Sequence, residues 1–220
     1  MRVRACRAFY GLRHSKGGGA MNVCEAAPAL CGKDEIRAAM RARRRAIPAA
    51  EKTAMDADVC ARLSGRRWRG PVAVYLASPC EIDLRIFIEA LLRRGTVLAA
   101  PRWNGGVYEL ARLRGLNDAS LQTGPMGIRE PAAAEPVSAH DISAWIVPGL
   151  AFTADGRRVG YGGGWYDRLL AGAAPGAEKI GVAYPFQLVD NLPMSPHDIR
   201  LSEVVCAATV ESPPNDEKSA

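Results

Sequence analysis

Apolar residues recur at helical spacing in some stretches of the chain and gather in short runs in others. Near the start, Ile36 and Met40 lie four residues apart on one helical face, and Pro48 separates this helix from a second one. Short apolar runs bounded by turn residues indicate strands. The predicted helices cover residues 33–45, 49–63, 83–94 and 165–171, and the predicted strands cover residues 71–77, 96–100, 107–113, 142–147, 179–184 and 203–210.

Helices and strands alternate along most of the chain. This order predicts a three-layer α/β fold, in which helices flank a mostly parallel central sheet. Residues 124–140, which hold three prolines, are expected to form a loop. We expect residues 33–211 to make one domain.

The two ends of the chain differ from this pattern. Residues 1–32 lack periodicity, and the first twenty of them carry five basic side chains and no acid, which is +5 of the net charge of +6. We expect a disordered leader over residues 1–32 and a disordered tail over residues 212–220. A transit peptide is the less favoured interpretation of the leader, because it has few serines and no long amphipathic face.

Composition narrows the expected partners and location. No apolar run reaches the length of about 18 residues that a membrane span needs, so we expect no membrane partner. The basic surplus lies mostly in the leader, so we expect no specific nucleic-acid partner either. The six cysteines are scattered without a C-x-x-C pair, which is typical of reduced thiols in the cytoplasm. We expect a cytoplasmic monomer.

A glycine-rich segment carries the clearest candidate chemistry. Gly160, Gly162, Gly163 and Gly164 follow a predicted strand and precede a predicted helix. A loop with so little side-chain bulk can turn several backbone N–H groups toward one phosphate, and the helix adds partial positive charge. Asp167, at the helix start, can hold a Mg²⁺ that bridges phosphate oxygens. The alternative is an ordinary glycine-rich surface loop with an acidic first turn.

The commoner phosphate-binding motifs do not fit this segment. A dinucleotide fingerprint needs glycine at position 165 or 167, where the chain has Trp165 and Asp167. No G-x-x-x-x-G-K-[ST] pattern occurs, so the chain is not a P-loop NTPase. The expected fold is therefore Rossmann-like without a dinucleotide fingerprint.

The same segment resembles a known family. Pro-Gly-Leu-Ala-Phe at 148–152, followed by Gly-Tyr-Gly-Gly-Gly-Trp-Tyr-Asp-Arg at 160–168, resembles the signature of 5-formyltetrahydrofolate cyclo-ligase, also called 5,10-methenyltetrahydrofolate synthetase. Residues 33–37, 74–76 with 81–83, and 192–193 with 197–198 agree in order and spacing. The resemblance covers about residues 33 to 210. Trp165 departs from it, since the family more often has tyrosine there.

Two basic residues near the start are candidates for phosphate contact. Lys33 and Arg37 lie four apart on one helical face, and Lys33 stands at a helix start, where the dipole disfavours a cation. The resemblance implies that both are catalytic and contact ATP, with Arg37 also near the folate. The alternative is a solvated ion pair with Asp34 or with the next turn. The run of Arg41, Arg43, Arg44 and Arg45 is expected to be a solvated face.

Two carboxylates outside the glycine segment complete the expected site. Glu81 lies just past the end of a predicted strand, where ligands of open α/β sheets collect, and the resemblance makes it a pterin-binding residue. Its alternative role is to favour the start of the following helix. Asp198 joins Asp167 as a Mg²⁺ ligand by resemblance, and an Asx turn is its alternative role. His197 is given no catalytic role.

The full set of expected contacts follows from the resemblance. Tyr161, Trp165 and Tyr166 also offer flat faces for the pterin or the adenine, and their alternative role is to pack in the core. ATP is expected to contact Lys33, Arg37, Arg158, Gly160, Gly162, Gly163, Gly164, Trp165 and Tyr166. The folate substrate is expected to contact Leu76, Glu81, Tyr161, Gly162, Gly163, Gly164 and Trp165.

The expected function is the ATP- and Mg²⁺-dependent conversion of 5-formyltetrahydrofolate to 5,10-methenyltetrahydrofolate, with release of ADP and phosphate. Two alternatives stay open. Another ATP-dependent ligase or kinase on a related scaffold keeps Asp167 and the glycine loop but does not need Glu81. A non-catalytic module that binds RNA or another polyanion shows salt-dependent binding that is lost with residues 1–45, and no ATP turnover.

Overall fold

The computed structural model describes residues 32–209, and the expected leader and tail fall outside the described residues apart from Gly32. The helices are α1 (Lys33–Arg45), α2 (Ala49–Ser64), α3 (Arg85–Arg93) and α4 (Trp165–Ala171), with short 3₁₀ turns η1 (Ala139–Asp141) and η2 (Pro185–Gln187). The strands are β1 (Val72–Ala73), β2 (Leu98–Asn104), β3 (Val107–Leu113), β4 (Leu121–Thr123), β5 (Arg129–Pro131), β6 (Ala144–Val147), β7 (Ala151–Phe152), β8 (Arg158–Val159), β9 (Glu178–Ala183) and β10 (Glu203–Cys206).

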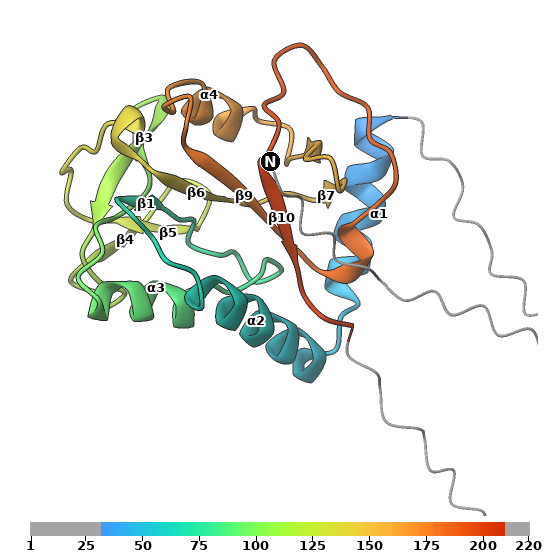
Figure 1. The fold of residues 1–220 in the computed structure, drawn as a ribbon, viewed down its shortest axis with the longest axis horizontal. Helices are drawn as coiled ribbons and strands as arrows, with labels where there is room; N and C mark the ends of the chain where they lie inside the picture. Colours follow the sequence, from blue (N-terminus) through green and yellow to red (C-terminus); the bar gives the residue numbers. More distant parts are fainter. Residues whose placement is uncertain (1–31, 210–220) are drawn as a thin grey trace, which may run out of the picture.

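Six strands form the central sheet in the order β10, β9, β6, β1, β2, β3 (Figure 1). All neighbouring pairs are parallel except β2 and β3, which form an antiparallel hairpin. The expected three-layer α/β fold with a mostly parallel sheet is thus confirmed.

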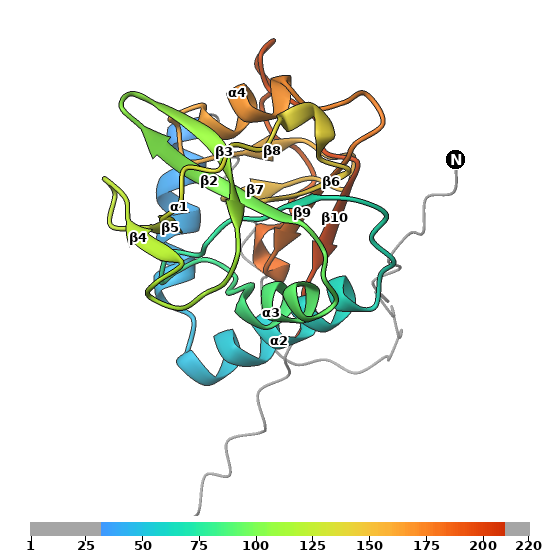
Figure 2. The same cartoon turned by 90° about the vertical axis from the view of Figure 1, so that its left-hand side faces the viewer.

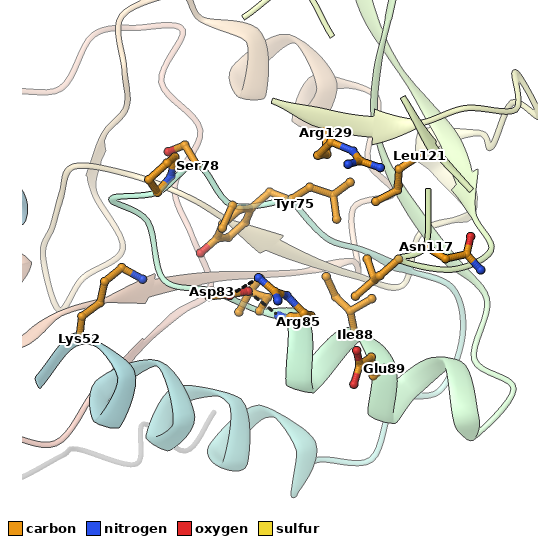
Figure 3. A pocket seen from close by; sticks show the side chains of 15 residues that line it. Lys52, Tyr75, Ser78, Asp83, Arg85, Ile88, Glu89, Asn117, Leu121 and Arg129 are labelled. Atoms are coloured by element: carbon orange, nitrogen blue, oxygen red, sulfur yellow. Dashed lines mark hydrogen bonds and ion pairs between the residues drawn. The ribbon is translucent and has the colours of Figure 1, made fainter. Parts of the chain in front are cut away.

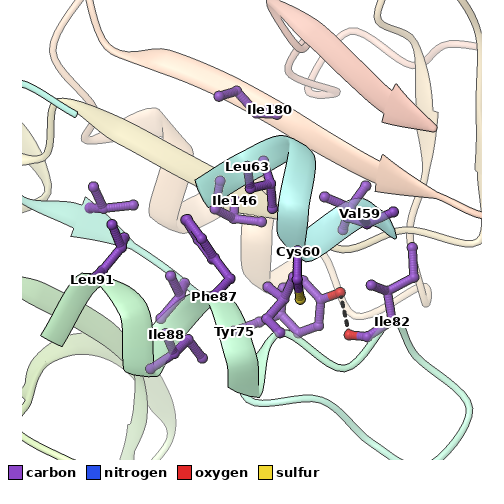
Figure 4. Packing of buried hydrophobic residues seen from close by; sticks show 14 of the residues in the cluster. Val59, Cys60, Leu63, Tyr75, Ile82, Phe87, Ile88, Leu91, Ile146 and Ile180 are labelled. Atoms are coloured by element: carbon purple, nitrogen blue, oxygen red, sulfur yellow. Dashed lines mark hydrogen bonds between the residues drawn. The ribbon is translucent and has the colours of Figure 1, made fainter. Parts of the chain in front are cut away.

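Alternating side chains connect the sheet to both helical layers. Successive residues of a strand face opposite sides, so Ile146 and Val147 of β6 enter different cores. Ile146 packs with Phe87 and other residues from α2 and α3 on one face (Figure 4). Val147 packs with Leu169 of α4 on the other. Both layers are apolar, and their burial supplies the main driving force for folding.

Helix α1 packs beside the β7–β8 hairpin rather than in either layer (Figure 1). Ile36 and Met40 contact a small cluster that includes Leu150, Ala151 and Val159. Because β8 leads directly into the glycine segment, this packing brings α1 next to the loop over residues 160–164.

Several predicted element bounds were wrong. Of the strand expected over residues 71–77, only Val72 and Ala73 form β1. The backbone of the flanking residues adds bonds from Val74 N to Ala99 O and from Ser143 N to Pro71 O before the chain turns away. The loop expected over residues 124–140 contains β5, which pairs with β4 and lies beside β2 (Figure 2). Buried Glu130 of β5 accepts hydrogen bonds from Trp103 N and Gln122 Nε2, so tertiary contacts hold this short strand.

The sheet topology places a crevice between β1 and β6. From β1 the chain moves through α3 to β2 on one side, whereas from β6 it moves through α4 to β9 and β10 on the other. In open α/β sheets, ligands bind outside the carboxyl ends of the strands at such a reversal of strand order. The loop that carries Glu81 follows β1, and Gly149 follows β6.

Candidate functional site

Glu81 and Tyr161 join two separate loops at this crevice. Glu81 is only 6% exposed, and its Oε2 accepts a hydrogen bond of 2.8 Å from Ser78 N. Its Oε1 accepts a hydrogen bond of 2.5 Å from the Tyr161 hydroxyl. The structure therefore brings together two predicted substrate residues that lie 80 positions apart.

Arg44 corrects one prediction from the sequence. We expected a solvated side chain, but Arg44 is 5% exposed, donates through Nη1 to the Tyr161 hydroxyl and donates through Nη2 to Gly149 O at 3.2 Å. The physical reason is its position, since residues 36, 40 and 44 are four apart and share the buried face of α1. This spacing was the signal that could have identified Arg44.

The chemistry of these groups fixes the direction of the hydrogen bonds. Arginine has donors only, so the Tyr161 oxygen accepts from Arg44 and its proton points to Glu81. Enclosure of the hydroxyl and the nearby Glu81 charge raise the pKa of Tyr161, so it stays protonated. Burial alone lowers the pKa of Arg44, but the contacts with Tyr161 and Glu81 outweigh this effect and raise it.

The glycine loop is held through its carbonyl groups. Gly160 O accepts a hydrogen bond of 3.0 Å from Arg37 Nε, and Gly163 O accepts one of 2.8 Å from Arg168 Nη2. Gly162 and Gly164 have φ angles of 108° and 64°, which favour glycine. Within residues 32–209, the backbone N–H groups of residues 160–164 donate to no protein acceptor. The loop thus offers donors that an anionic ligand can use.

Ion pairs join the predicted site residues to one another and to Asp34. Lys33 Nζ is 2.5 Å from Asp198 Oδ2, and Arg158 Nη2 is 2.7 Å from Asp167 Oδ1. Asp34 pairs with Arg37 instead of Lys33, at 2.5 Å. The backbone N–H of Ile199 also donates to Asp167 Oδ1, at 3.4 Å, which brings the segment with Asp198 to Asp167. Burial alone raises the pKa of Asp198, but hydrogen bonds from Lys33 and from Ser195 N outweigh burial and lower it.

The carboxylate oxygens of Asp167 and Asp198 suit a hard cation that also binds a second molecule. Asp167 uses Oδ1 for its contacts and Asp198 uses Oδ2, so one oxygen of each has no hydrogen bond within the described residues. Mg²⁺ typically takes one or two carboxylates together with water and substrate phosphates. Residues 32–209 gather no cluster of three or more His, Cys, Asp or Glu side chains, so protein groups alone do not enclose a metal ion.

The three aromatic candidates lie in different surroundings. Trp165 makes edge contacts with Trp103 and Tyr108, at ring-centroid distances of 5.4 and 5.3 Å. Tyr166 packs against the cores on both faces of the sheet. Tyr161 is 41% exposed, and its hydroxyl alone is held inside. Tyr161 therefore offers the most accessible ring of the three.

A cleft of about 700 Å³ is lined by residues 75–79, which follow β1 and precede Glu81, but Glu81 itself does not line it (Figure 3). Leu76, a predicted substrate residue, lines it together with Tyr75 and Ser78. Arg129 of β5 also lines it and pairs with Asp118 at 2.8 Å. Sequence reasoning missed Arg129 because the β4–β5 hairpin was not predicted. A smaller hollow of about 190 Å³ is lined by Ser78, Tyr161 and Arg44 among others, so Ser78 borders both spaces.

The fold is that of an open α/β protein, a class in which ligands collect at the carboxyl ends of the parallel strands. The model of the 5-formyltetrahydrofolate cyclo-ligase family matches residues 30–207, and the chain belongs to this family. It is accordingly an enzyme of the ligase class.

Individual relatives agree with the family assignment. The chain is 30% identical to 5-formyltetrahydrofolate cyclo-ligase of Mycolicibacterium smegmatis over 79% of this chain and 92% of the relative. It is 31% identical to the Escherichia coli K12 protein of the same name over 78% and 98%. An NMR structure of Aquifex aeolicus 5,10-methenyltetrahydrofolate synthetase has a TM-score of 0.70 and 30% identity, and covers 84% of this chain and 98% of that chain.

Membrane insertion through a helix finds no support in the described residues. None of the helices within residues 32–209 has both the length and the apolar character that crossing a bilayer requires.

Proposed function

We propose that the chain converts 5-formyltetrahydrofolate to 5,10-methenyltetrahydrofolate in a reaction that depends on ATP and Mg²⁺. The observation that carries the proposal is the meeting of Glu81 with the glycine loop through Tyr161, because a folate site and a phosphate site must adjoin for this chemistry. The family relationship supports the same substrate class.

The chemistry explains why ATP is needed. A formamide oxygen is a poor leaving group, so nitrogen-10 closes the ring slowly unless that oxygen is activated. Transfer of the γ-phosphoryl group to the formyl oxygen gives ADP and a phosphorylated intermediate. Nitrogen-10 then attacks the formyl carbon and releases its proton to solvent, and phosphate leaves with the formyl oxygen. The protein supplies position and charge neutralisation rather than a covalent nucleophile.

We assign the folate to the carboxylate side of the crevice. Glu81 accepts hydrogen bonds from the amino-pyrimidine edge of the pterin, because each of its oxygens has a further lone pair beyond its present contact. Leu76 packs against the folate from the neighbouring cleft. The accessible ring of Tyr161 and the edge of Trp165 lie beside residues 162–164, which both substrates approach.

We assign the ATP phosphates to the cationic side of the crevice. Lys33, Arg37 and Arg158 lie around the glycine loop and provide positive charge. Gly160, Gly162, Gly163 and Gly164 provide backbone donors. The ATP contact expected of Tyr166 stays a prediction. Asp167 and Asp198 hold Mg²⁺ through their remaining oxygens, and the ion neutralises charge on the phosphates.

Two alternative functions and three general expectations remain under test. Another ATP-dependent ligase or kinase explains the glycine loop but gives the buried Glu81 carboxylate no ligand. A polyanion-binding module explains the basic surplus but not the paired carboxylates. One domain over residues 33–211, a cytoplasmic location and a monomeric state stay predictions.

The test is the appearance of methenyl-folate absorbance after the protein is mixed with 5-formyltetrahydrofolate, ATP and Mg²⁺. We expect product only when all components are present, and equal amounts of ADP and product. Omission of ATP, chelation of Mg²⁺ with EDTA and the Glu81→Gln variant serve as controls. ATP hydrolysis without folate conversion favours the ligase or kinase alternative, and salt-dependent RNA binding without turnover favours the module.

A further inference from the structure

A chain of three side chains crosses the site and comes from three separate segments. Arg44 belongs to α1, Tyr161 belongs to the glycine loop and Glu81 belongs to the loop after β1. The Tyr161 hydroxyl is the central member, since it accepts from Arg44 and donates to Glu81. Because arginine has donors only, the Tyr161 oxygen must accept from Arg44, and the Tyr161 proton is left to donate to Glu81.

Tyr161 also connects the Glu81 carboxylate to the loop backbone. Its carbonyl oxygen accepts a hydrogen bond of 3.2 Å from Arg41 Nη2, and the preceding Gly160 O accepts from Arg37. The side chain of Tyr161 thus reaches the Glu81 carboxylate, while its backbone is part of the glycine loop. A movement of Glu81 toward a bound ligand must move the Tyr161 hydroxyl or break its hydrogen bond.

We propose that Tyr161 couples the Glu81 carboxylate to the glycine loop, so that folate and nucleotide strengthen each other's binding, and that Arg44 is the positioning residue that fixes the Tyr161 hydroxyl. This inference rests on the proposed function, because it takes a folate at Glu81 and ATP phosphates at the loop. The gain is reciprocal, since a coupling between two ligands changes both affinities by the same factor.

The burial of Arg44 favours a positioning role over a role in general stability. Buried arginine is costly unless its donors are used, and Arg44 Nε has no hydrogen-bond partner within the described residues. An apolar residue at position 44 would fill the same face of α1 without this cost. Within the described residues, the Arg44 side chain makes two hydrogen bonds, one with the Tyr161 hydroxyl and one with Gly149 O at the carboxyl end of β6.

The experiment measures binding of 5-formyltetrahydrofolate by titration calorimetry, with and without a non-hydrolysable ATP analogue and Mg²⁺. In the wild type, we expect the analogue to tighten folate binding by about fivefold or more. In Tyr161→Phe, which removes only the hydroxyl oxygen, we expect the analogue to tighten folate binding by less than about twofold. The reverse titration, of the analogue with and without folate, must give the same factors.

Tyr184→Phe is the matched control. It also removes a tyrosine hydroxyl that donates to a carboxylate, Asp56 Oδ1 at 2.9 Å, but within residues 32–209 no hydrogen bond or ring contact joins Tyr184 to the glycine loop. In Tyr184→Phe we expect the analogue to tighten folate binding by the same factor as in the wild type, even if the melting temperature of the variant falls. A loss of coupling in both variants would assign the effect to stability and overturn the inference.

Variants of Arg44 test whether this residue positions the Tyr161 hydroxyl. Arg44→Met should lose the coupling as Tyr161→Phe does, and Arg44→Lys should recover part of it, because lysine keeps a donor for the Tyr161 hydroxyl. Melting curves show whether each variant folds. If Arg44→Met does not fold, Tyr161→Phe alone decides the role of Tyr161, and Arg44→Lys decides that of Arg44.

The possible failures are distinguishable. Coupling in Tyr161→Phe equal to that of the wild type overturns this inference alone, as does a wild type that binds both ligands independently. A wild type that binds no 5-formyltetrahydrofolate overturns the proposed function together with the inference.

Discussion

The sheet face covered by α2 and α3 and the crevice at the carboxyl ends of β1 and β6 bury their side chains for different reasons. On that face, Phe87, Leu91 and Ile146 are almost fully enclosed by other apolar groups. At the crevice, the buried side chains include charged Arg44 and Glu81. Apolar burial stabilises a fold, whereas burial of charge costs free energy that pairing only offsets. The first region therefore supports the fold, whereas the burial of charge in the second is what a site for the proposed ligands would need.

The largest expected effect is a loss of stability caused by a substitution in the apolar region. Phe87→Ala should lower the free energy of unfolding by about 3–5 kcal/mol, since it removes a fully buried ring and leaves a cavity. Urea denaturation measures this change. Ile86→Ala is the control, because Ile86 is exposed on the same helix and its replacement should change stability by less than about 0.5 kcal/mol. Similar values for the two variants would contradict the packing described.

Glu81→Gln tests the crevice without a large change in shape. One acceptor oxygen becomes a donor, so a pterin donor faces another donor, at a typical cost of about 1.5–3 kcal/mol. We expect kcat/KM for 5-formyltetrahydrofolate to fall at least about tenfold, while the dissociation constant of an ATP analogue, measured without folate, stays within about twofold.

A control for this variant is Glu178→Gln, at the amino end of β9 and thus at the opposite edge of the sheet. It should leave both constants unchanged. Unaltered folate kinetics in Glu81→Gln would remove the pterin assignment and favour a different ATP-dependent enzyme.

Asp167→Asn should act on the metal rather than on the folate. A neutral amide is a poorer ligand for Mg²⁺ than a carboxylate, so the Mg²⁺ concentration for half-maximal rate should rise severalfold, and added Mg²⁺ should partly restore the rate. The variant also removes the negative charge that pairs with buried Arg158, although the amide oxygen can still accept its hydrogen bond, so we expect a lower melting temperature. Steady-state rates at several Mg²⁺ concentrations check the first effect. A defect that Mg²⁺ does not relieve would assign Asp167 to the support of Arg158 alone.

The smallest effect concerns pH. The pKa of Asp198 is lowered in the folded state, so its ion pair with Lys33 stabilises the fold above the unfolded pKa of about 3.9, and this contribution is lost as pH falls through the folded value. Between neutral pH and pH 3, the wild type should therefore lose more stability than Asp198→Asn, by at most about 1 kcal/mol for a pair of this kind. Urea denaturation at a series of pH values checks this. Parallel curves would show that the pair adds nothing.

The sequence predicted the regions with clear local signals. The bounds of α1 and α4 agree with the prediction, since a proline follows the first and glycines flank the second. It did not predict the β4–β5 hairpin, because the hairpin is held in part by the contact of Glu130 with Trp103 of β2, 27 residues earlier. Local propensity carries no information on such contacts.

The candidate site divides in the same way. The motif identified Glu81, Asp167 and the glycine loop as candidates, but not how their side chains connect. Arg44 looked like one of four solvated arginines until the packing of α1 showed which face is buried. Lys33 is followed in sequence by the acidic residues Asp34 and Glu35, but its partner Asp198 is visible only in the folded chain.

The Lys33–Asp198 contact can form only late in the synthesis of the chain. Lys33 is made early during synthesis, and Asp198 comes 165 residues later. A growing chain therefore holds the first half of its cationic site long before the carboxylate that neutralises it exists. The ribosome must pass residue 198 before this part of the site can close, so a prematurely terminated chain exposes Lys33 without its partner.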